Sequence, residues 1–283
     1  MIVCRTIKEI RKETGKQKQE GKTISFVPTM GALHEGHLSL IREAKKHADL
    51  VVVSIFVNPE QFGPKEDFDT YPRETESDLQ KCRDEGVSIV FLPDRRELYP
   101  EEKYLRIEID DLNRHMCGVS RPGFFEGILL VVNKLFNIVE PDAALFGQKD
   151  IQQFLILSRM VNEFNHDIKM VMVPITRAND GLALSSRNAY LSREEREAAP
   201  SLYRSLQYIE KQILEGVDAP KLLIEHQKSE LEAKGFEIDY LNVFARKTLE
   251  PADSLIKGGS YILAGAASLG KTRLIDNILI DDY

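Results

Sequence analysis

The feature that most constrains the fold is an apolar run at residues 50–57, Leu-Val-Val-Val-Ser-Ile-Phe-Val. Most of its side chains are β-branched, and polar residues do not alternate with apolar ones. This composition is typical of a strand buried on both faces of a parallel sheet, because helices cover both faces. The run ends at Asn58-Pro59, a turn sequence that we expect at the carboxyl end of the strand.

Further strands and amphipathic helices alternate around this run. Connections of this length suit right-handed crossovers between parallel strands. The sequence therefore predicts an α/β fold with a doubly wound parallel sheet, whose ligand crevice lies beyond the carboxyl ends of the strands. The expected strands are 24–27, 50–57, 87–92, 103–109, 143–146 and 168–173, and the expected helices are 7–18, 38–47, 75–85, 127–139 and 151–164.

The pattern changes after Asn188. Ser192 and Glu195 have capping-box spacing at the start of a helix that we expect to run to about Glu215. A second helix at 219–234 and strands at 236–244, 261–266 and 273–280 complete a smaller α+β unit. We place the domain boundary between residues 185 and 186, which gives domains 1–185 and 186–283.

Composition limits the classes of function. The chain has 283 residues and a net charge of -7, which argues against a nucleic-acid or membrane-surface role. Its apolar runs are too short to span a membrane, and residues 1–19 lack the apolar core of a signal peptide. Cys4, Cys82 and Cys117 are widely spaced and form no CxxC pair, as expected in the reducing cytoplasm.

The turn at residues 27–38, Val-Pro-Thr-Met-Gly-Ala-Leu-His-Glu-Gly-His-Leu, joins an expected strand to an expected helix. Such a turn offers backbone N–H groups and a helix dipole to an anion. Gly31 and Gly36 let the backbone approach a ligand, and the imidazoles of His34 and His37 suit charge stabilisation during phosphoryl or adenylyl transfer. The spacing fits neither HExxH nor a P-loop. Histidines at a turn are also often ordinary solvated or capping residues.

Three other turns carry polar side chains. Gln61 follows the run at 50–57 and offers a donor and an acceptor to a small substrate. Lys149 and Asp150 follow the strand at 143–146, where the lysine is a mobile charge for phosphate. The Ser185–Arg187 segment places two hydroxyls beside a guanidinium, which suits an anion. Each turn alone is compatible with a solvated loop.

Together these turns lie in segments that resemble one family, the pantothenate synthetases (pantoate–β-alanine ligases, AMP-forming). The HxGH signature in the first segment is shared by the wider nucleotidylyltransferase superfamily, whereas the NPxQF, FGxKDxQQ and SSRN pieces are more specific. The resemblance extends over nearly the whole chain. Its segments are VPTMGALHEGHLSLI at 27–41, VSIFVNPEQFGPKEDFDTYPR at 53–73, RPGFFEGILLVVNKLFNIVEPD at 121–142, FGQKDIQQF at 146–154, DGLALSSRNAYLS at 180–192 and RLIDN at 273–277.

The resemblance implies a Rossmann-like domain at 1–185 that binds nucleotide and pantoate, and a C-terminal lid at 186–283. It implies that ATP and pantoate form pantoyl adenylate, which β-alanine then converts to pantothenate and AMP. It also implies Mg²⁺ on the phosphates, a homodimer and no protein metal ligands. The implied catalytic residues are His34, His37, Lys149 and Arg187. The implied ATP-binding residues are Pro28, Thr29, Met30, His34, His37, Gly147, Lys149, Asp150, Ser185, Ser186 and Arg187, and the implied pantoate-binding residues are Gln61 and Gln153.

Two positions depart from the family pattern. Phe124 stands where the family usually has histidine, and Leu184 stands where methionine is usual. We expect the first to alter ATP affinity and the second to be mild, because leucine and methionine have similar volumes.

Two alternatives to the ligase remain. A nucleotidylyltransferase acting on a phosphorylated acceptor should have basic residues in place of Gln61 and Gln153. A non-catalytic nucleotide-binding protein does not need His34, His37, Lys149 and Arg187 together.

Overall fold

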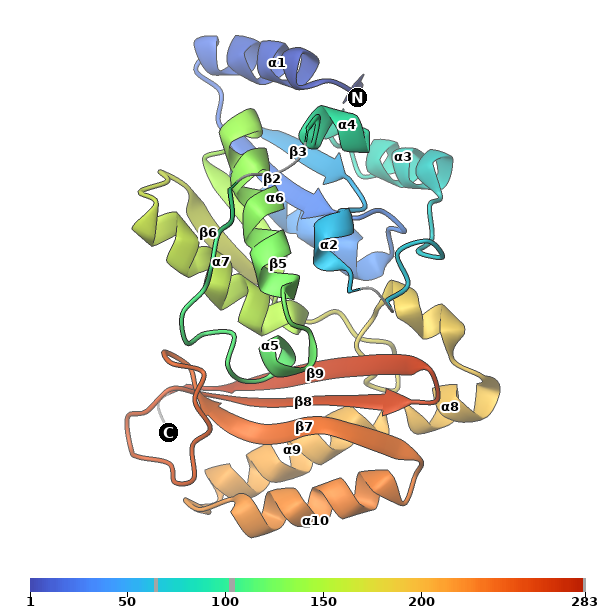
Figure 1. Ribbon diagram of the computed structural model, residues 1–283, viewed down its shortest axis with the longest axis vertical. Coiled ribbons are helices and arrows are strands. Elements are labelled where there is room, and N and C mark those ends of the chain that lie inside the picture. Colours follow the sequence, from blue (N-terminus) through green and yellow to red (C-terminus); the bar gives the residue numbers. More distant parts are fainter. Residues whose placement is uncertain (64–65, 102–104, 282–283) are drawn as a thin grey trace. The chain divides into compact units, whose positions relative to one another are not determined.

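The structure is a computed structural model that describes residues 1–63, 66–101 and 105–281 (Figure 1). Its internal contacts divide the chain into two compact units. The first unit comprises Met1–Ile109, Arg121–Gln148 and Gln153–Pro174, and the second comprises Asp110–Ser120, Lys149–Gln152 and Ile175–Tyr283. The predicted domains are a nucleotide- and pantoate-binding domain at 1–185 and a lid at 186–283. This division by function stays a prediction.

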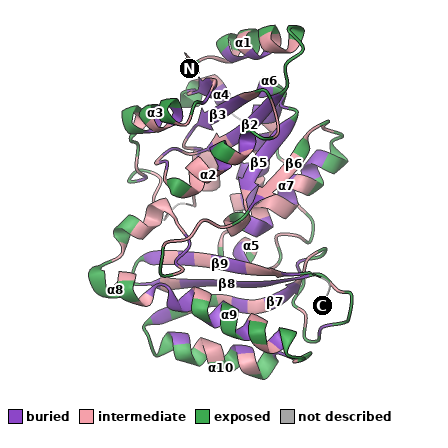
Figure 2. Ribbon diagram, turned by 180° about the vertical axis from the view of Figure 1, so that it is seen from behind, coloured by how far each residue is buried: buried purple, intermediate pink, exposed green. Residues whose placement is uncertain are grey.

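The first unit contains a six-stranded sheet in which all neighbouring strands are parallel. Its spatial order is β1-β4-β3-β2-β5-β6. The central strands are buried along most of their length (Figure 2), as the apolar run at 50–57 predicted. The strands are β1 (Ile2–Cys4), β2 (Ile24–Thr29), β3 (Leu50–Ile55), β4 (Ile89–Phe91), β5 (Ala143–Gly147) and β6 (Lys169–Val173).

Helices cover both faces of this sheet. Side chains of α2 (Glu35–Ala44) and α3 (Thr75–Asp84) share one buried cluster with β2, β3 and β4. On the other face, Phe136 of α6 (Phe124–Val139) packs edge-on against Phe26 of β2 and Phe146 of β5. Helices α1 (Ile7–Gln19) and α7 (Ile151–Glu163), like α6, each join one strand to another that lies further along the sheet toward β6. Because right-handed crossovers that run the same way along a sheet place their helices on the same face, α1 and α7 lie on the α6 face.

The strand order reverses direction between β2 and β5. These strands are neighbours, but β2 leads to β3 on one side and β5 leads to β6 on the other. In doubly wound sheets, ligands bind at such a switch point beyond the carboxyl ends of the strands. Thr29 and Gly147 end these two strands, so the predicted residues Met30, His34 and Lys149 lie in the connections that follow them.

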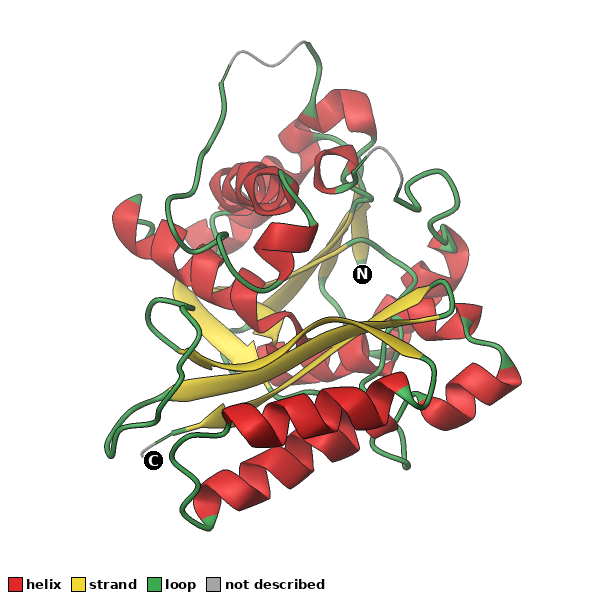
Figure 3. Ribbon diagram, turned by 60° about the horizontal axis from the view of Figure 1, so that its bottom comes forward, coloured by secondary structure: helices red, strands yellow, loops and turns green. Residues whose placement is uncertain are grey.

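The second unit contains an antiparallel sheet of β7 (Phe236–Ala245), β8 (Tyr261–Leu269) and β9 (Thr272–Ile280). Helices α9 (Ser201–Leu214) and α10 (Lys221–Glu232) lie along one face of it (Figure 3). Their apolar side chains and those of the strands form a buried cluster around Leu206 and Leu263. This is the smaller α+β unit that the sequence predicted.

The predicted strand at 103–109 is absent over residues 105–109, the part of it that the structure describes, and one predicted helix is divided in two. The capping box at Ser192 and Glu195 is confirmed, with the serine side chain accepting from the Glu195 N–H and the glutamate accepting from the Ser192 N–H. The predicted single helix to Glu215 is wrong, because α8 (Arg193–Ala198) ends before Pro200 and α9 starts after it. Proline has no N–H to donate, and its ring clashes with the preceding helical turn.

Within the described ranges, no helix combines the length and the apolar character that crossing a membrane requires.

Candidate active site

The turn between β2 and α2 brings the two predicted histidines together. His34 is the N-cap of α2, so the helix begins three residues earlier than the sequence predicted. Its Nδ1 accepts the Gly36 N–H at 3.1 Å, and the Nδ1 of His37 accepts the His34 N–H at 3.3 Å. The two rings lie 4.2 Å apart, centroid to centroid. A Cβ at Gly36 would come within 2.8 Å of the His34 ring, so glycine is needed here.

These hydrogen bonds fix the chemistry of both imidazoles. Because each Nδ1 accepts a backbone N–H, each neutral ring carries its proton on Nε2. His34 and His37 are each half-buried. The start of α2 therefore presents two imidazole donors beside the positive end of a helix dipole, an arrangement that favours an anion.

A carboxylate from α3 holds the same turn from behind. Asp78, which is 1% exposed, accepts the N–H groups of Ala32 and Leu33 at 2.8 and 2.7 Å. Burial raises the pKa of Asp78 above its ordinary value, and these two hydrogen bonds partly oppose that rise. Gly31 and Ala32 have positive φ angles of 82° and 49°. The carboxylate thus stabilises a turn that the backbone alone adopts poorly.

The turn after β3 holds Gln61, at the end of the short 3₁₀ helix Pro59–Gln61. The Gln61 side chain accepts from Asn58 Nδ2 at 3.0 Å and donates to the sulfur of Met30 at 3.1 Å. Asn58 is 1% exposed and is itself held by the Tyr99 hydroxyl and the Gly127 carbonyl. Burial raises the pKa of Tyr99, so its hydroxyl remains a donor. The predicted residues Met30 and Gln61 are therefore in direct contact.

Position 124 has a defined environment. The Arg121 guanidinium stacks on the Phe124 ring, 3.4 Å from its centroid, and makes two hydrogen bonds to Glu66 at 2.7 and 2.6 Å. Arg121 also donates to the backbone carbonyl of Gln61 at 3.3 Å. The Phe124 ring therefore supports an arginine that contacts the Gln61 turn.

The β5–α7 connection carries the next predicted residues. Gly147 ends β5, Lys149 and Asp150 lie in a 3₁₀ turn (Gln148–Asp150), and Gln153 lies in the first turn of α7. Lys149 and Gln153 are half-buried and Asp150 is exposed. The contacts assign Gly147 and Gln153 to the first unit and Lys149 and Asp150 to the second.

The Ser185–Arg187 segment belongs wholly to the second unit. Ser185 caps the 3₁₀ helix Ser186–Tyr190, and its hydroxyl accepts the Arg187 N–H at 3.3 Å. Asn188 Nδ2 donates to the Ala183 carbonyl at 3.0 Å and ties the helix to the preceding strand-like residues. Ser185, Ser186 and Arg187 are all half-buried.

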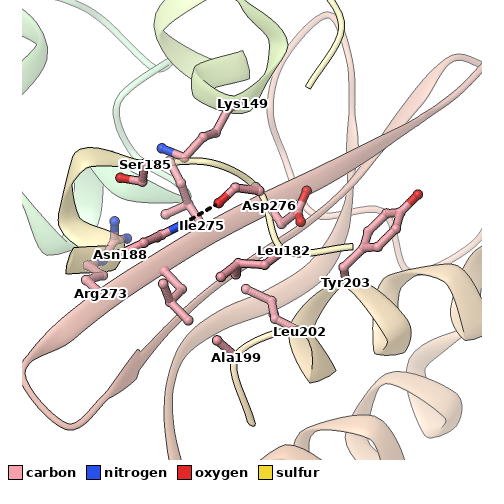
Figure 4. A pocket seen from close by; sticks show the side chains of 12 residues that line it. Lys149, Leu182, Ser185, Asn188, Ala199, Leu202, Tyr203, Arg273, Ile275 and Asp276 are labelled. Atoms are coloured by element: carbon pink, nitrogen blue, oxygen red, sulfur yellow. Dashed lines mark hydrogen bonds between the residues drawn. The ribbon is translucent and has the colours of Figure 1, made fainter. Parts of the chain in front are cut away.

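Lys149 and Ser185 line one cavity of the second unit (Figure 4). Its apolar side is formed by residues such as Leu182, Leu202 and Leu274, and its polar side also includes Arg273. The structure therefore brings the predicted lysine and the first predicted serine to one surface, which also carries the Asp276 carboxylate and an arginine, Arg273, that is paired with Asp239.

The predicted site residues thus fall into two groups. The first unit holds His34, His37, Met30 and Gln61 around two turns that contact one another, Pro28 and Thr29 in β2, and Gly147 and Gln153. Lys149, Asp150 and the Ser185–Arg187 segment belong to the second unit.

Three residues outside the predicted set hold the backbone of these turns or of the neighbouring 112–117 segment. Asp78 holds the histidine turn and Asn58 holds Gln61. The buried Gln152 side chain donates to the Leu112 and His115 carbonyls and accepts the Cys117 N–H, each at 2.9 Å. Nothing in the local pattern marks Asp78, whereas Asn58 and Gln152 lie inside the quoted motifs and were passed over.

Among the described residues, no three histidine, cysteine, aspartate or glutamate side chains are grouped so that they could hold a metal ion.

Comparisons with known proteins agree on one family. The family model for pantoate–β-alanine ligase matches residues 2–279. Pantothenate synthetase from Thermotoga petrophila is 48% identical over 99% of this chain and 100% of its own. The one from Carboxydothermus hydrogenoformans is 50% identical over 97% of each chain.

Solved structures agree. The crystal structure of pantothenate synthetase from Thermus thermophilus has a TM-score of 0.90 at 40% identity and covers 98% of this chain and 99% of its own. The Francisella tularensis ligase, described as complexed with β,γ-ATP and β-alanine, has a TM-score of 0.82 at 35% identity and covers 99% and 97%. The chain belongs to the pantoate–β-alanine ligase family.

Proposed function

We propose that this protein is an ATP-dependent pantoate–β-alanine ligase. A pantoate carboxylate oxygen attacks the α-phosphorus of ATP, which forms pantoyl adenylate and releases pyrophosphate. The amine of β-alanine then attacks the acyl carbon, which forms the amide bond of pantothenate and releases AMP. Family membership and the solved complex of the Francisella ligase with an ATP compound and β-alanine support this assignment.

The observation that carries the proposal is the histidine turn. A carboxylate that approaches a triphosphate meets like charge, so the reaction needs donors aimed at the phosphate oxygens. The Nε2–H groups of His34 and His37 are such donors, and their orientation is fixed by backbone N–H groups. No protein nucleophile is needed, and catalysis rests on positioning and electrostatic stabilisation.

We assign the remaining predicted residues by the same logic. Lys149 and Arg187 supply positive charge to the phosphates, with the hydroxyls of Ser185 and Ser186 as donors. Pro28, Thr29, Met30, Gly147 and Asp150 contact the nucleotide, and Gln61 and Gln153 bind pantoate. The direct contact between Gln61 and Met30 supports the placement of pantoate beside the nucleotide residues of the first unit.

From the family resemblance we also propose Mg²⁺ as an ion carried by the triphosphate, since Mg²⁺ usually binds substrate phosphates and keeps several of its waters. When bound, it would neutralise charge on the phosphate oxygens. We also propose, from the family resemblance, a homodimer in the cytoplasm and a lid role for residues 186–283.

The side chain at position 61 separates the ligase from a nucleotidylyltransferase with a phosphorylated acceptor. Gln61 is neutral, and its amide is held by Asn58 and Met30 rather than by an acidic partner. A neutral amide suits the hydroxyl and carboxylate groups of pantoate better than a phosphate dianion, for which arginine or lysine is preferred.

The test is pyrophosphate release on mixing the protein with ATP and Mg²⁺. With pantoate alone we expect a burst of about one equivalent, and with β-alanine added we expect steady turnover. The matched control replaces pantoate with a phosphorylated alcohol. Steady release with that acceptor would favour the nucleotidylyltransferase, and no release with either, while ATP still binds, would favour a non-catalytic protein.

A further inference from the structure

Two successive residues of β9 make polar contacts on opposite faces of the sheet in the second unit. Asp276 and Asn277 are 4% and 2% exposed, although β9 is otherwise built mainly from apolar residues. Successive side chains of a strand point to opposite faces. Buried polar groups in a sheet are costly unless each finds a partner, so their partners indicate what they do.

Asp276 holds the segment that leads into Ser185. It makes a two-point ion pair with Arg177, at 2.5 and 2.8 Å, and the Arg177 guanidinium stacks 3.4 Å above the Tyr203 ring of α9. Arg177 also donates to the Gly181 carbonyl at 3.0 Å. The Asp276 carboxylate of this ion pair is almost fully buried. The ion pair therefore fixes the 177–183 loop to β9.

Backbone hydrogen bonds connect this loop to the residues that directly precede Ser185. Residues Arg177 and Ala183 form an antiparallel bridge, and the Leu184 N–H donates to the Thr176 carbonyl at 3.0 Å. Ser185 follows directly. The position of the Ser185–Arg187 segment is therefore set relative to Asp276.

Asn277 holds Lys149. Its Nδ2 donates to the Lys149 backbone carbonyl at 3.1 Å, and its own N–H donates to Asp276 Oδ1 at 2.8 Å. One dipeptide of β9 is thus bonded on one side to the loop that carries Ser185 and on the other to the residue that carries the predicted catalytic amine.

We propose that Asn277 is a positioning residue, which fixes Lys149 relative to the Ser185–Arg187 segment from a strand that Asp276 locks to that segment. The inference rests on the proposed ligase function, in which both groups act on the phosphates of ATP. Asn277 itself contacts no substrate in this account. Its effect is on where the lysine amine lies, and small displacements of such a group reduce rates strongly.

The test compares Asn277→Ala with Asn242→Ala. Asn242 lies in the same row of the sheet, paired through Ala264 of β8 to Asn277, and its side chain accepts its neighbour's Val243 N–H at 2.9 Å. Both variants remove one amide from the same sheet. Calorimetric ATP affinity, pyrophosphate release with pantoate, aminolysis of supplied pantoyl adenylate and the thermal midpoint are measured for each.

For Asn277→Ala we expect ATP affinity and pyrophosphate release each to fall about five- to tenfold, the effect of one lost hydrogen bond. Aminolysis should stay within about twofold, since pyrophosphate has already left, and Asn242→Ala should match the wild type in all three. Equal ATP affinity and pyrophosphate release in the two variants, or an equal loss in both half-reactions of Asn277→Ala, would overturn the proposal. If the wild type binds ATP but releases no pyrophosphate, the ligase function fails, and the affinity comparison still decides whether Asn277 positions the lysine.

Discussion

At the scale of single residues, the His34 side chain has two roles that a substitution can separate. Its Nδ1 caps helix α2, and its Nε2–H is the proposed donor to phosphate. His34→Asn keeps an acceptor for the Gly36 N–H, because asparagine is among the best N-caps. The asparagine side chain does not supply the donor that the Nε2–H of His34 provides. We expect adenylate formation, measured as pyrophosphate release, to fall roughly 10²- to 10³-fold while the thermal midpoint changes little. Lys149→Ala should reduce the same step by a similar factor.

The matched control is Arg159→Ala, which removes an exposed cation of α7 that pairs only loosely with Glu163. It should leave pyrophosphate release unchanged. Near-normal turnover in both His34→Asn and Lys149→Ala would show that the site has been assigned to the wrong residues.

Phe124 stands where the family resemblance predicts histidine, and it contacts an arginine that reaches the Gln61 turn. Its half-buried ring supports the Arg121 guanidinium, and an imidazole can stack in the same way while adding an N–H donor. We expect Phe124→His to fold normally and to change the KM for ATP by about two- to fivefold, a fraction of one hydrogen-bond equivalent. Steady-state kinetics at saturating pantoate measure this change.

The neighbouring residue provides the control. Phe125 is 2% exposed, so Phe125→His should lower the thermal midpoint by several degrees, because it places a polar ring in the core. If Phe124→His loses as much stability as Phe125→His, then Phe124 is a core residue rather than part of the site.

The resemblance supplied the predicted site residues, but local patterns did not reveal what holds them. Asp78 is 45 positions from the turn that it supports, and its spacing on α3 resembles that of any polar helix residue. Only the packing of α3 beside the turn shows its role. Long-range hydrogen bonds of this kind leave no periodic signal in a single sequence.

At the scale of elements, the end of α7 is tied to α6 by an imidazole. His166 Nε2 donates to Asn133 Oδ1 at 2.9 Å, and aromatic rings of Phe136 and Phe164 lie close by. Burial lowers the pKa of His166 below its ordinary value. The neutral form is therefore favoured in the folded state.

A lowered pKa in a base stabilises the fold above the unfolded-state pKa, and this contribution is lost as pH falls through the folded-state pKa. We therefore expect the free energy of unfolding to decrease as pH is lowered from about 7.5 to about 5.5, and His166→Gln to flatten part of this decrease. Urea unfolding across that range measures the effect. His226→Gln, at an exposed position of α10, should keep the wild-type pH dependence. An unchanged slope in His166→Gln would contradict the prediction.

Elements with strong periodicity were predicted well, and element boundaries less so. The capping box at Ser192 is present as expected, and the strand predicted at 50–57 is present but ends two residues earlier, at Ile55. The helix break at Pro200 follows from proline chemistry, which the prediction of a single helix did not take into account. The early start of α2 was missed because histidine is not among the usual N-cap residues.

At the scale of the whole molecule, each compact unit has a buried apolar cluster of its own. Leu145 of β5 and Leu206 of α9 are both fully buried, and each belongs to the cluster of a different unit. Proteins with separate cores often unfold in more than one step. We expect scanning calorimetry of the wild type to give two overlapping transitions.

A core substitution in one unit should lower the midpoint temperature of that unit's transition and leave the other unchanged. Leu145→Ala and Leu206→Ala each remove buried methyl groups and leave a cavity, which costs roughly 2–5 kcal/mol. The first should lower only the transition of the first unit, and the second only that of the second unit. If both sets of predicted residues bind the nucleotide, ATP should raise the midpoint temperature of the lowered transition in either variant. A ligand that binds only the folded state increases the stability of that state. A single transition that both substitutions lower equally would mean that the units unfold as one cooperative body.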